Sequence, residues 1–160
     1  MIQGKLLGIA TRKKSRAAME EFESIEISMD RGCVGDFRGS AGARQVTVLS
    51  REAWETVCDN IGQSLPWTDR RANLFVEGLE LIETESCEIR IGEVRLRITG
   101  ETDPCQRMVE VASGLREALT PQWRGGVCCR VIQGGHIAVG DTITLATPSD
   151  GTLAESRQRY

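Results

Sequence analysis

The sequence lacks the features that identify several large classes of protein. No apolar run approaches the length of roughly 20 residues that a membrane-spanning helix needs. Residues 1–10 also lack the long apolar stretch of a secretory signal and are better interpreted as a first strand, so we expect a cytoplasmic protein with no membrane partner. No P-loop sequence, no G-x-G-x-x-G fingerprint and no internal repeat is present. These absences argue against membrane proteins, repeat proteins and the common nucleotide-binding folds.

Histidine and excess positive charge are also scarce. The chain has one histidine, and 20 basic side chains stand against 23 acidic ones, which gives a net charge of −3. Nonspecific nucleic-acid binding needs a basic surface, so this balance argues against a nucleic-acid partner. One basic cluster, at 12–16, is followed closely by two glutamates. We interpret it as a solvent-facing loop or short helix rather than a phosphate or RNA site.

Six cysteines are present, but their spacing fits neither a zinc site nor a disulfide framework. No two form a C-x-x-C pair, and the single histidine, His136, is expected to face solvent on a hairpin. Without an export signal we expect free thiols. Core packing is the preferred interpretation of Cys58 and Cys87. Cys128 and Cys129 are neighbours on a predicted strand, so at most one of them can face a given pocket.

Short alternating segments separated by turn residues dominate the chain. A length of 160 residues suits one domain, which we place at 1–146, followed by a polar tail at 147–160 without periodicity. The density of short strands predicts a mainly β fold with some α, either a barrel or a sandwich. The predicted strands are 5–10, 25–28, 45–49, 74–76, 87–91, 94–99, 127–133, 136–139 and 142–145.

Two helices are predicted, and both are expected to cover barrel openings or faces. The first follows Ser50, a suitable N-cap, and ends before Gly62. The second has Asp103 as its N-cap and Pro104 at its first helical position, and it ends near residues 120–121.

Cys105 is the main candidate for chemistry. In the predicted second helix it lies in the first turn, where unpaired backbone N–H groups and the helix dipole favour a thiolate by up to about 2 kcal/mol. Arg107 can add to this effect if its guanidinium turns back toward the sulfur. Packing at a strand–helix junction is the alternative, because free cysteine is often buried. The residues alone leave both interpretations open.

Four segments in a fixed order carry a family resemblance: 32–49, 71–81, 91–108 and 124–141. Together they resemble the MOSC domain, the C-terminal domain of molybdenum cofactor sulfurase, which also occurs as a stand-alone bacterial protein. No single segment is specific, but the ordered set is. The resemblance implies a β-barrel similar to the pyruvate kinase barrel, with about two flanking helices.

The resemblance also implies a site. Cys105 corresponds to the family's cysteine, regarded as a sulfur carrier or as the thiolate ligand of molybdenum, and both roles need a thiolate. The phosphate of a bound molybdopterin would need cations and hydrogen-bond donors. The candidates for that binding are Arg38, Arg44, Arg71 and Arg107, with Asn73 as a hydrogen-bonding partner. Arg71 and Asn73 share a face if their segment is extended, and an ordinary ion pair is the alternative for each arginine.

Two classes of function follow from the resemblance. In the first, the protein carries sulfur as a Cys105 persulfide or binds the molybdenum cofactor, with pyridoxal phosphate involved only through a partner cysteine desulfurase. In the second, it is a molybdenum-dependent reductase of N-hydroxylated compounds with Cys105 as metal ligand. Such an enzyme would need a partner electron-transfer protein, because the sequence has no Cys₄ iron–sulfur pattern and no flavin or nicotinamide motif. The sequence favours the first class, and a non-catalytic barrel with an inert Cys105 is the third possibility.

Overall fold

Alternating apolar and polar residues form the strands that dominate the protein. A computed structural model describes residues 2–148. Its strands are β1 (Ile2–Thr11), β2 (Glu20–Glu21), β3 (Ser24–Ser28), β4 (Gly32–Cys33), β5 (Val46–Ser50), β6 (Leu74–Glu77), β7 (Glu88–Ile91), β8 (Val94–Glu101), β9 (Val127–Gln133), β10 (Gly135–Ala138) and β11 (Thr142–Ala146). Its helices are α1 (Arg51–Ile61), α2 (Gln106–Val111) and α3 (Leu115–Leu119), with 3-10 turns η1 (Trp67–Arg70) and η2 (Pro121–Trp123).

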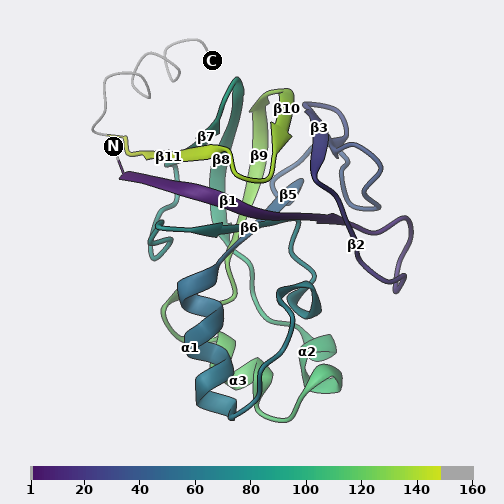
Figure 1. Ribbon diagram of the computed structural model, residues 1–160, viewed down its shortest axis with the longest axis vertical. Helices are drawn as coiled ribbons and strands as arrows, with labels where there is room; N and C mark the ends of the chain where they lie inside the picture. Colours follow the sequence, from purple (N-terminus) through teal and green to yellow (C-terminus); the bar gives the residue numbers. More distant parts are fainter. Residues whose placement is uncertain (1, 149–160) are drawn as a thin grey trace.

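Seven of these strands close into a barrel. Their order is β11-β7-β8-β9-β5-β6-β1, and β1 pairs with β11 to complete the ring. The pairings are antiparallel except that of β5 with β6, which is parallel. A smaller sheet, β10-β3-β4, lies beside the barrel (Figure 1). The predicted mainly β barrel of the MOSC type is therefore confirmed.

The barrel interior is filled by the apolar face of each strand. On β8, Val94, Leu96 and Ile98 are at most 1 % exposed, while the arginines between them point outward. Burying a side chain of this size contributes about 1.5–3 kcal/mol relative to leaving it in water. Each predicted strand is present to within about three residues at either end. The sequence analysis missed β2 and β4, which have two residues each and are too short to show a period.

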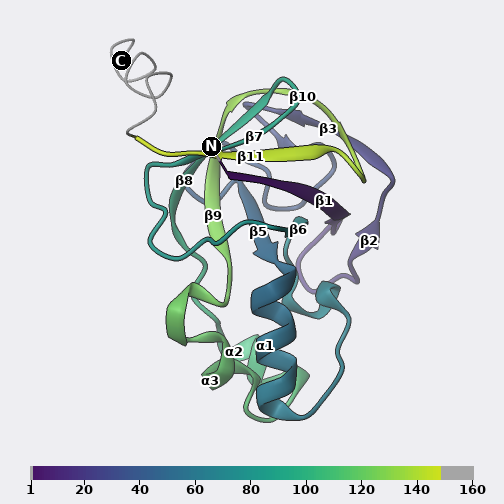
Figure 2. The same cartoon turned by 60° about the vertical axis from the view of Figure 1, so that its left-hand side comes forward.

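Helix α1 confirms the first predicted helix. Ser50 Oγ accepts a hydrogen bond from Ala53 N at 3.1 Å, and Gly62 ends the helix in the left-handed conformation with φ 67°. Its buried face, with Trp54 and Val57, packs in a second apolar cluster at one end of the barrel. All three helices gather at that end (Figures 1 and 2), as the prediction that helices cover a barrel opening requires.

The second predicted helix is wrong in its start and in its continuity. The chain stays extended through Cys105 (φ −102°, ψ 177°), so α2 begins only at Gln106. Thr102 N donates to Gly126 O, and no side chain caps the start of α2. Burial raises the pKa of Glu101, and the neighbouring Asp103 carboxyl adds to the effect.

The helical region also breaks in the middle. Ala112 is extended, and Gly114 is left-handed with φ 80°, so α2 and α3 are two short helices. The apolar residues whose spacing predicted one helix, Met108, Ala112, Leu115 and Leu119, nevertheless all enter the second cluster. Three short helices therefore stand where about two were expected.

Several smaller expectations can also be compared with the structure. All six cysteines are free; Cys87 lies in the core and Cys58 packs half-buried on α1, as predicted. His136 is exposed beside the predicted turn. Across residues 2–148, no helix is both long and apolar enough to cross a membrane. Most of the predicted polar tail, residues 149–160, lies outside the described residues.

Candidate functional site

The six residues predicted to form the site come together in one cavity of about 510 Å³. Its walls are the residues after β1, the loop from β4 to β5, the η1 turn and the junction from β8 to α2. The predicted residues in these walls are Cys105, Arg38, Arg44, Arg71, Asn73 and Arg107. Residues from four separate parts of the chain thus meet in one place.

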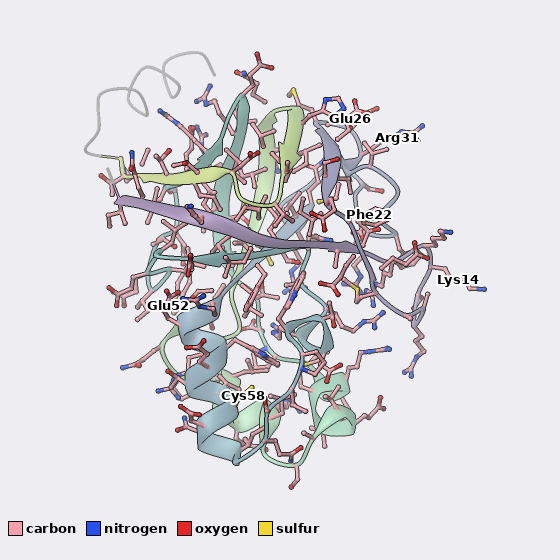
Figure 3. The ribbon with its side chains drawn as sticks, viewed as in Figure 1. Lys14, Phe22, Glu26, Arg31, Glu52 and Cys58 are labelled. Atoms are coloured by element: carbon pink, nitrogen blue, oxygen red, sulfur yellow. The ribbon has the colours of Figure 1, made fainter. Side chains whose placement is uncertain are left out.

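The cavity also contains residues that the sequence analysis did not select. The basic cluster at 12–16 forms a loop in which residues 13–16 are exposed, as predicted, and Arg12, Ser15 and Arg16 also line the cavity. Within that cluster, Lys13 and Lys14 are exposed, and Lys14 points away from the molecule (Figure 3). Arg12 directly follows β1, so the barrel fixes its backbone. This position just after the first strand was the sequence feature that could have identified Arg12 as a cavity residue. The remaining additions include Arg70, Thr47, Thr102 and Cys128.

Positive charge dominates the cavity. Seven arginines and two aspartates line it, a formal surplus of five positive charges in a protein whose net charge is −3. Across residues 2–148, none of these seven arginines lies within 4 Å of a carboxylate. Among the described residues, the ordinary ion pair considered for each arginine is therefore not formed. On the outer face of the barrel, by contrast, Arg90, Arg95 and Arg97 all form ion pairs with Glu88.

Arg70 is fixed in the cavity wall by backbone carbonyls. It is 6 % exposed; its Nε donates to Gly125 O at 3.0 Å and its Nη2 to Thr102 O at 2.9 Å. A Cβ at residue 125 would lie 2.6 Å from Thr102 O and 3.1 Å from Arg70 Nη2, so only glycine fits there. Burial lowers the pKa of Arg70, and nearby Cys105 and Cys128 oppose that effect. Arg70 thus places a guanidinium beside both thiols.

Arg71 carries a donor without an acceptor. Its Nη2 donates to Ala17 O, but its Nε is buried and has no partner among residues 2–148. A buried unsatisfied polar group costs about 1–3 kcal/mol. Burial lowers the pKa of Arg71 to about 10, and repulsion from Arg107 and Arg12 adds to the lowering. Both observations indicate a site that an anion would stabilise.

Arg71 is not extended, contrary to the assumption that placed it on one face with Asn73. It has φ 68° and ends the η1 turn. Asn73 is 5 % exposed, and its Oδ1 accepts from Thr47 N at 3.0 Å and from Thr47 Oγ1 at 3.3 Å. Its Nδ2 donates to Ala10 O at 3.1 Å. Asn73 therefore joins the strands on both sides of it, with at most one amide hydrogen left for a ligand.

Cys105 is exposed at the cavity and directly precedes α2. The helix has six residues and the Cys105 side chain does not cap it, so the helix dipole contributes less than the sequence suggested. The arginines supply the positive field instead. Cys128 is a second cavity thiol, 3 % exposed, with its Sγ 3.2 Å from Thr102 Oγ1. Cys129 lies in the barrel core, so the two neighbours face opposite sides as predicted.

A comparison with protein-family models identifies the family of this chain. A family model of the MOSC domain matches residues 33–144, which is most of the chain. The chain belongs to the MOSC domain family. This family is associated with binding of the molybdenum cofactor. The matched range contains all six residues that were predicted to form the site.

Solved structures agree on the fold. The MOSC protein described here resembles the YuaD protein from Bacillus subtilis with a TM-score of 0.78 and 20% sequence identity, covering 92% of this chain and 99% of that chain. It also resembles YiiM from Geobacillus stearothermophilus (TM-score 0.74, 14% identity, 92% and 77% covered) and YiiM from Escherichia coli (0.69, 15%, 89% and 70%). No curated protein sequence matches the chain. At these identities the likeness shows the fold alone.

The cavity of this MOSC domain fits the phosphate-bearing cofactor associated with its family. A phosphate needs several N–H donors, which the unpaired arginines and the buried Arg71 Nε offer. A metal already held by sulfur ligands can accept a further cysteine sulfur, and Cys105 places an accessible sulfur at the same cavity. The chemistry of the donor set therefore agrees with the family association.

Proposed function

We propose that the protein binds the molybdenum cofactor in the arginine cavity, with Cys105 as the thiolate ligand of the metal. The observation that carries the proposal is the meeting of an accessible thiol with seven arginines, none of which lies within 4 Å of a carboxylate across residues 2–148. An anionic ligand would remove the repulsion among these arginines and give the buried Arg71 Nε an acceptor. The first predicted class of function, sulfur carriage or cofactor binding, is the one that these features favour.

Each residue has a distinct part in this proposal. Arg71 and Arg107 would hold the cofactor phosphate, because both line the cavity and the charge of Arg107 adds to the burial that lowers the pKa of Arg71. Arg70 would stabilise negative charge on Cys105, since backbone carbonyls fix its guanidinium in place. Asn73 would position the wall by joining it to Ala10 and Thr47. When bound, the molybdenum cofactor supplies two-electron chemistry at the metal.

Sulfur carriage is the second candidate, and the exposure of Cys105 favours it. A partner cysteine desulfurase, itself dependent on pyridoxal phosphate, would present a persulfide at the cavity. The Cys105 thiolate attacks the outer sulfur of that persulfide; a new S–S bond forms at Cys105, the old S–S bond breaks, and the partner's cysteine leaves as a thiolate. A reductase of N-hydroxylated compounds would instead use Cys105 as metal ligand and take electrons from a separate electron-transfer protein.

Metal and pterin analysis tests the first proposal. The full chain is purified from a host that makes the cofactor, and molybdenum and pterin fluorescence are measured per chain. We expect both in the wild type, loss of molybdenum in Cys105→Ala, and loss of molybdenum and pterin in Arg71→Ala. Cys58→Ala and Arg31→Ala are the matched controls, because Cys58 lies on α1 and Arg31 points away from the molecule (Figure 3). Absence of molybdenum and pterin from the wild type would contradict the proposal.

Intact-mass analysis tests sulfur carriage separately. The purified chain is incubated with a cysteine desulfurase and cysteine. A carrier gains the mass of one sulfur atom, and the gain disappears in Cys105→Ser but not in Cys58→Ser. An unchanged wild-type mass would exclude carriage and leave cofactor binding to be judged by its metal content.

A further inference from the structure

A second cavity, of about 420 Å³, shares no lining residue with the arginine cavity. Its walls are the first turns of α1, the loop after β6, and the η2 turn with the residues that follow it. We propose that this cavity binds a small zwitterion with an apolar body: an amino acid or short peptide with free amino and carboxylate groups and an apolar side chain. The inference goes beyond the proposed function and does not depend on the cofactor.

The inner side of the second cavity is apolar. Leu79 and Leu81 are 3 % and 5 % exposed and belong to the barrel core, and Trp123 packs against that core. Ile82 lines the same cavity but is 38 % exposed, so an apolar ligand group would remove its side chain from water. Small-molecule sites are typically apolar surfaces of this kind, with a few polar groups that fix the orientation of the ligand.

One wall of the second cavity is acidic. Glu52 lies at the end of α1 that meets the barrel (Figure 3), and its Oε2 accepts from Gly78 N at 3.0 Å, which ties the helix to the loop after β6. Glu80 is exposed on the same loop. Across residues 2–148, neither carboxylate lies within 4 Å of a basic nitrogen. A ligand ammonium group could therefore form charge-assisted hydrogen bonds with this wall.

The other wall carries the opposite charge on Arg124. Its Nη1 donates to Ala118 O and its Nη2 to Gln122 Oε1, both at 3.5 Å, which is long for a hydrogen bond. Both acceptors are neutral, and no carboxylate of the described residues lies within 4 Å of Arg124. A ligand carboxylate would accept shorter, charge-assisted hydrogen bonds from the same guanidinium.

The backbone that carries Arg124 is strained. Gln122 and Trp123 have φ 53° and 58°, in the left-handed region, and neither is glycine. Arg124 N donates to Pro121 O and Gly126 N to Trp123 O, both at 3.1 Å, and these bonds hold the turn. Strained residues of this kind gather at ligand-binding sites. Here the turn brings an apolar ring and a cation to one cavity.

These features together select the class of ligand. A simple anion would meet the two glutamates, and a simple cation would meet Arg124, whereas a zwitterion offers each wall the opposite charge. Its apolar body would cover the leucine, isoleucine and tryptophan side chains. The cavity volume of about 420 Å³ lies within the range of roughly 300–1,000 Å³ that is usual for small-molecule sites.

Calorimetric titration of the full chain tests the inference with two probes, L-leucine and L-leucyl-L-leucine. We expect one site per chain, and the probe that binds more tightly identifies the source as a free amino acid or a peptide. N-acetyl-L-leucinamide keeps the apolar body but lacks both charges, so it should bind at least about tenfold more weakly. Arg124→Gln and Glu80→Gln, one from each wall, should each weaken binding about tenfold. Arg31→Ala and Glu85→Gln change exposed residues outside the cavity and should match the wild type.

Several outcomes would overturn the inference. One is no binding of either probe, and another is equal binding of the uncharged compound. Arg124→Gln and Glu80→Gln variants that bind like their controls would also contradict it; Glu80 is exposed, so its substitution leaves the core intact. Arg71→Ala should bind the probes like the wild type, and a loss there would move the site to the arginine cavity. Failure of the proposed function would show differently, as a wild type without molybdenum or pterin that still binds the probes.

Discussion

Substitution of Gly125 by alanine should disturb the cavity through one steric contact. The added Cβ would lie 2.6 Å from Thr102 O and 3.1 Å from Arg70 Nη2. Contacts below 3.0 Å with backbone atoms require the backbone to shift. The shift would separate Arg70 from one or both of its carbonyl acceptors, Gly125 O and Thr102 O.

The expected loss can be worked out from those two hydrogen bonds. A hydrogen bond from a charged donor contributes about 1.5–3 kcal/mol, so losing one or both lowers the free energy of unfolding by about 2–4 kcal/mol after partial relaxation. Urea unfolding followed by tryptophan fluorescence measures it. Gly100→Ala is the matched control, because a Cβ at residue 100 meets nothing within 4 Å. Equal unfolding midpoints for the two variants would refute the role given to Gly125 and Arg70.

Three further predictions concern ionic contacts and the barrel wall. Burial alone would raise the pKa of Glu88, but hydrogen bonds from Arg95 and Arg97 and the charge of Arg90 outweigh it and hold the pKa below its usual value of 4.5. The stabilisation by Glu88 is therefore present above pH 4.5 and is lost as the pH falls below it. Glu88→Gln should lower the free energy of unfolding by about 3 kcal/mol at pH 7 and should weaken its dependence on pH in the acid range. An unchanged dependence of the free energy of unfolding on pH would contradict this. Asn73→Ala removes three hydrogen bonds and should lower the free energy of unfolding by about 2–3 kcal/mol in urea titration; a loss below 0.5 kcal/mol would count against its positioning role. Phosphate that binds the folded protein should raise the thermal unfolding midpoint of the wild type at concentrations above its dissociation constant, while chloride at equal ionic strength should not. Arg71→Ala should reduce this rise. Equal effects of both anions would argue against a specific phosphate site.

The strands and the first helix could be predicted because each depends on local pattern. The alternation over Val94–Glu101 and the Ser50 and Gly62 boundaries of α1 are set by neighbouring residues in the chain. The second helix could not be predicted in the same way. Its apolar spacing correctly predicted which residues pack in the second cluster. However, the helix starts later than predicted because Thr102 pairs with Gly126, a residue distant in sequence, and it is interrupted at Gly114.

The candidate site was predicted through family resemblance more than through local pattern. The local pattern selected Cys105, the resemblance added four arginines and Asn73, and the structure places all six in one cavity. Arg12 was missed because barrel closure brings it to the cavity. Arg70 was missed because it is held in the cavity wall by a carbonyl 55 residues away in sequence. The basic cluster at 12–16 is an exposed loop, as predicted, but charge composition does not show that Arg12, Ser15 and Arg16 also border the cavity.

The molybdenum content of the full chain, purified from a cofactor-competent host, tests the central claim most directly. We predict close to one molybdenum per chain in the wild type and in Arg31→Ala, and little in Cys105→Ala and Arg71→Ala. A wild type without molybdenum, or a Cys105→Ala variant that retains it fully, would contradict the assignment of Cys105 and the arginine cavity to the cofactor.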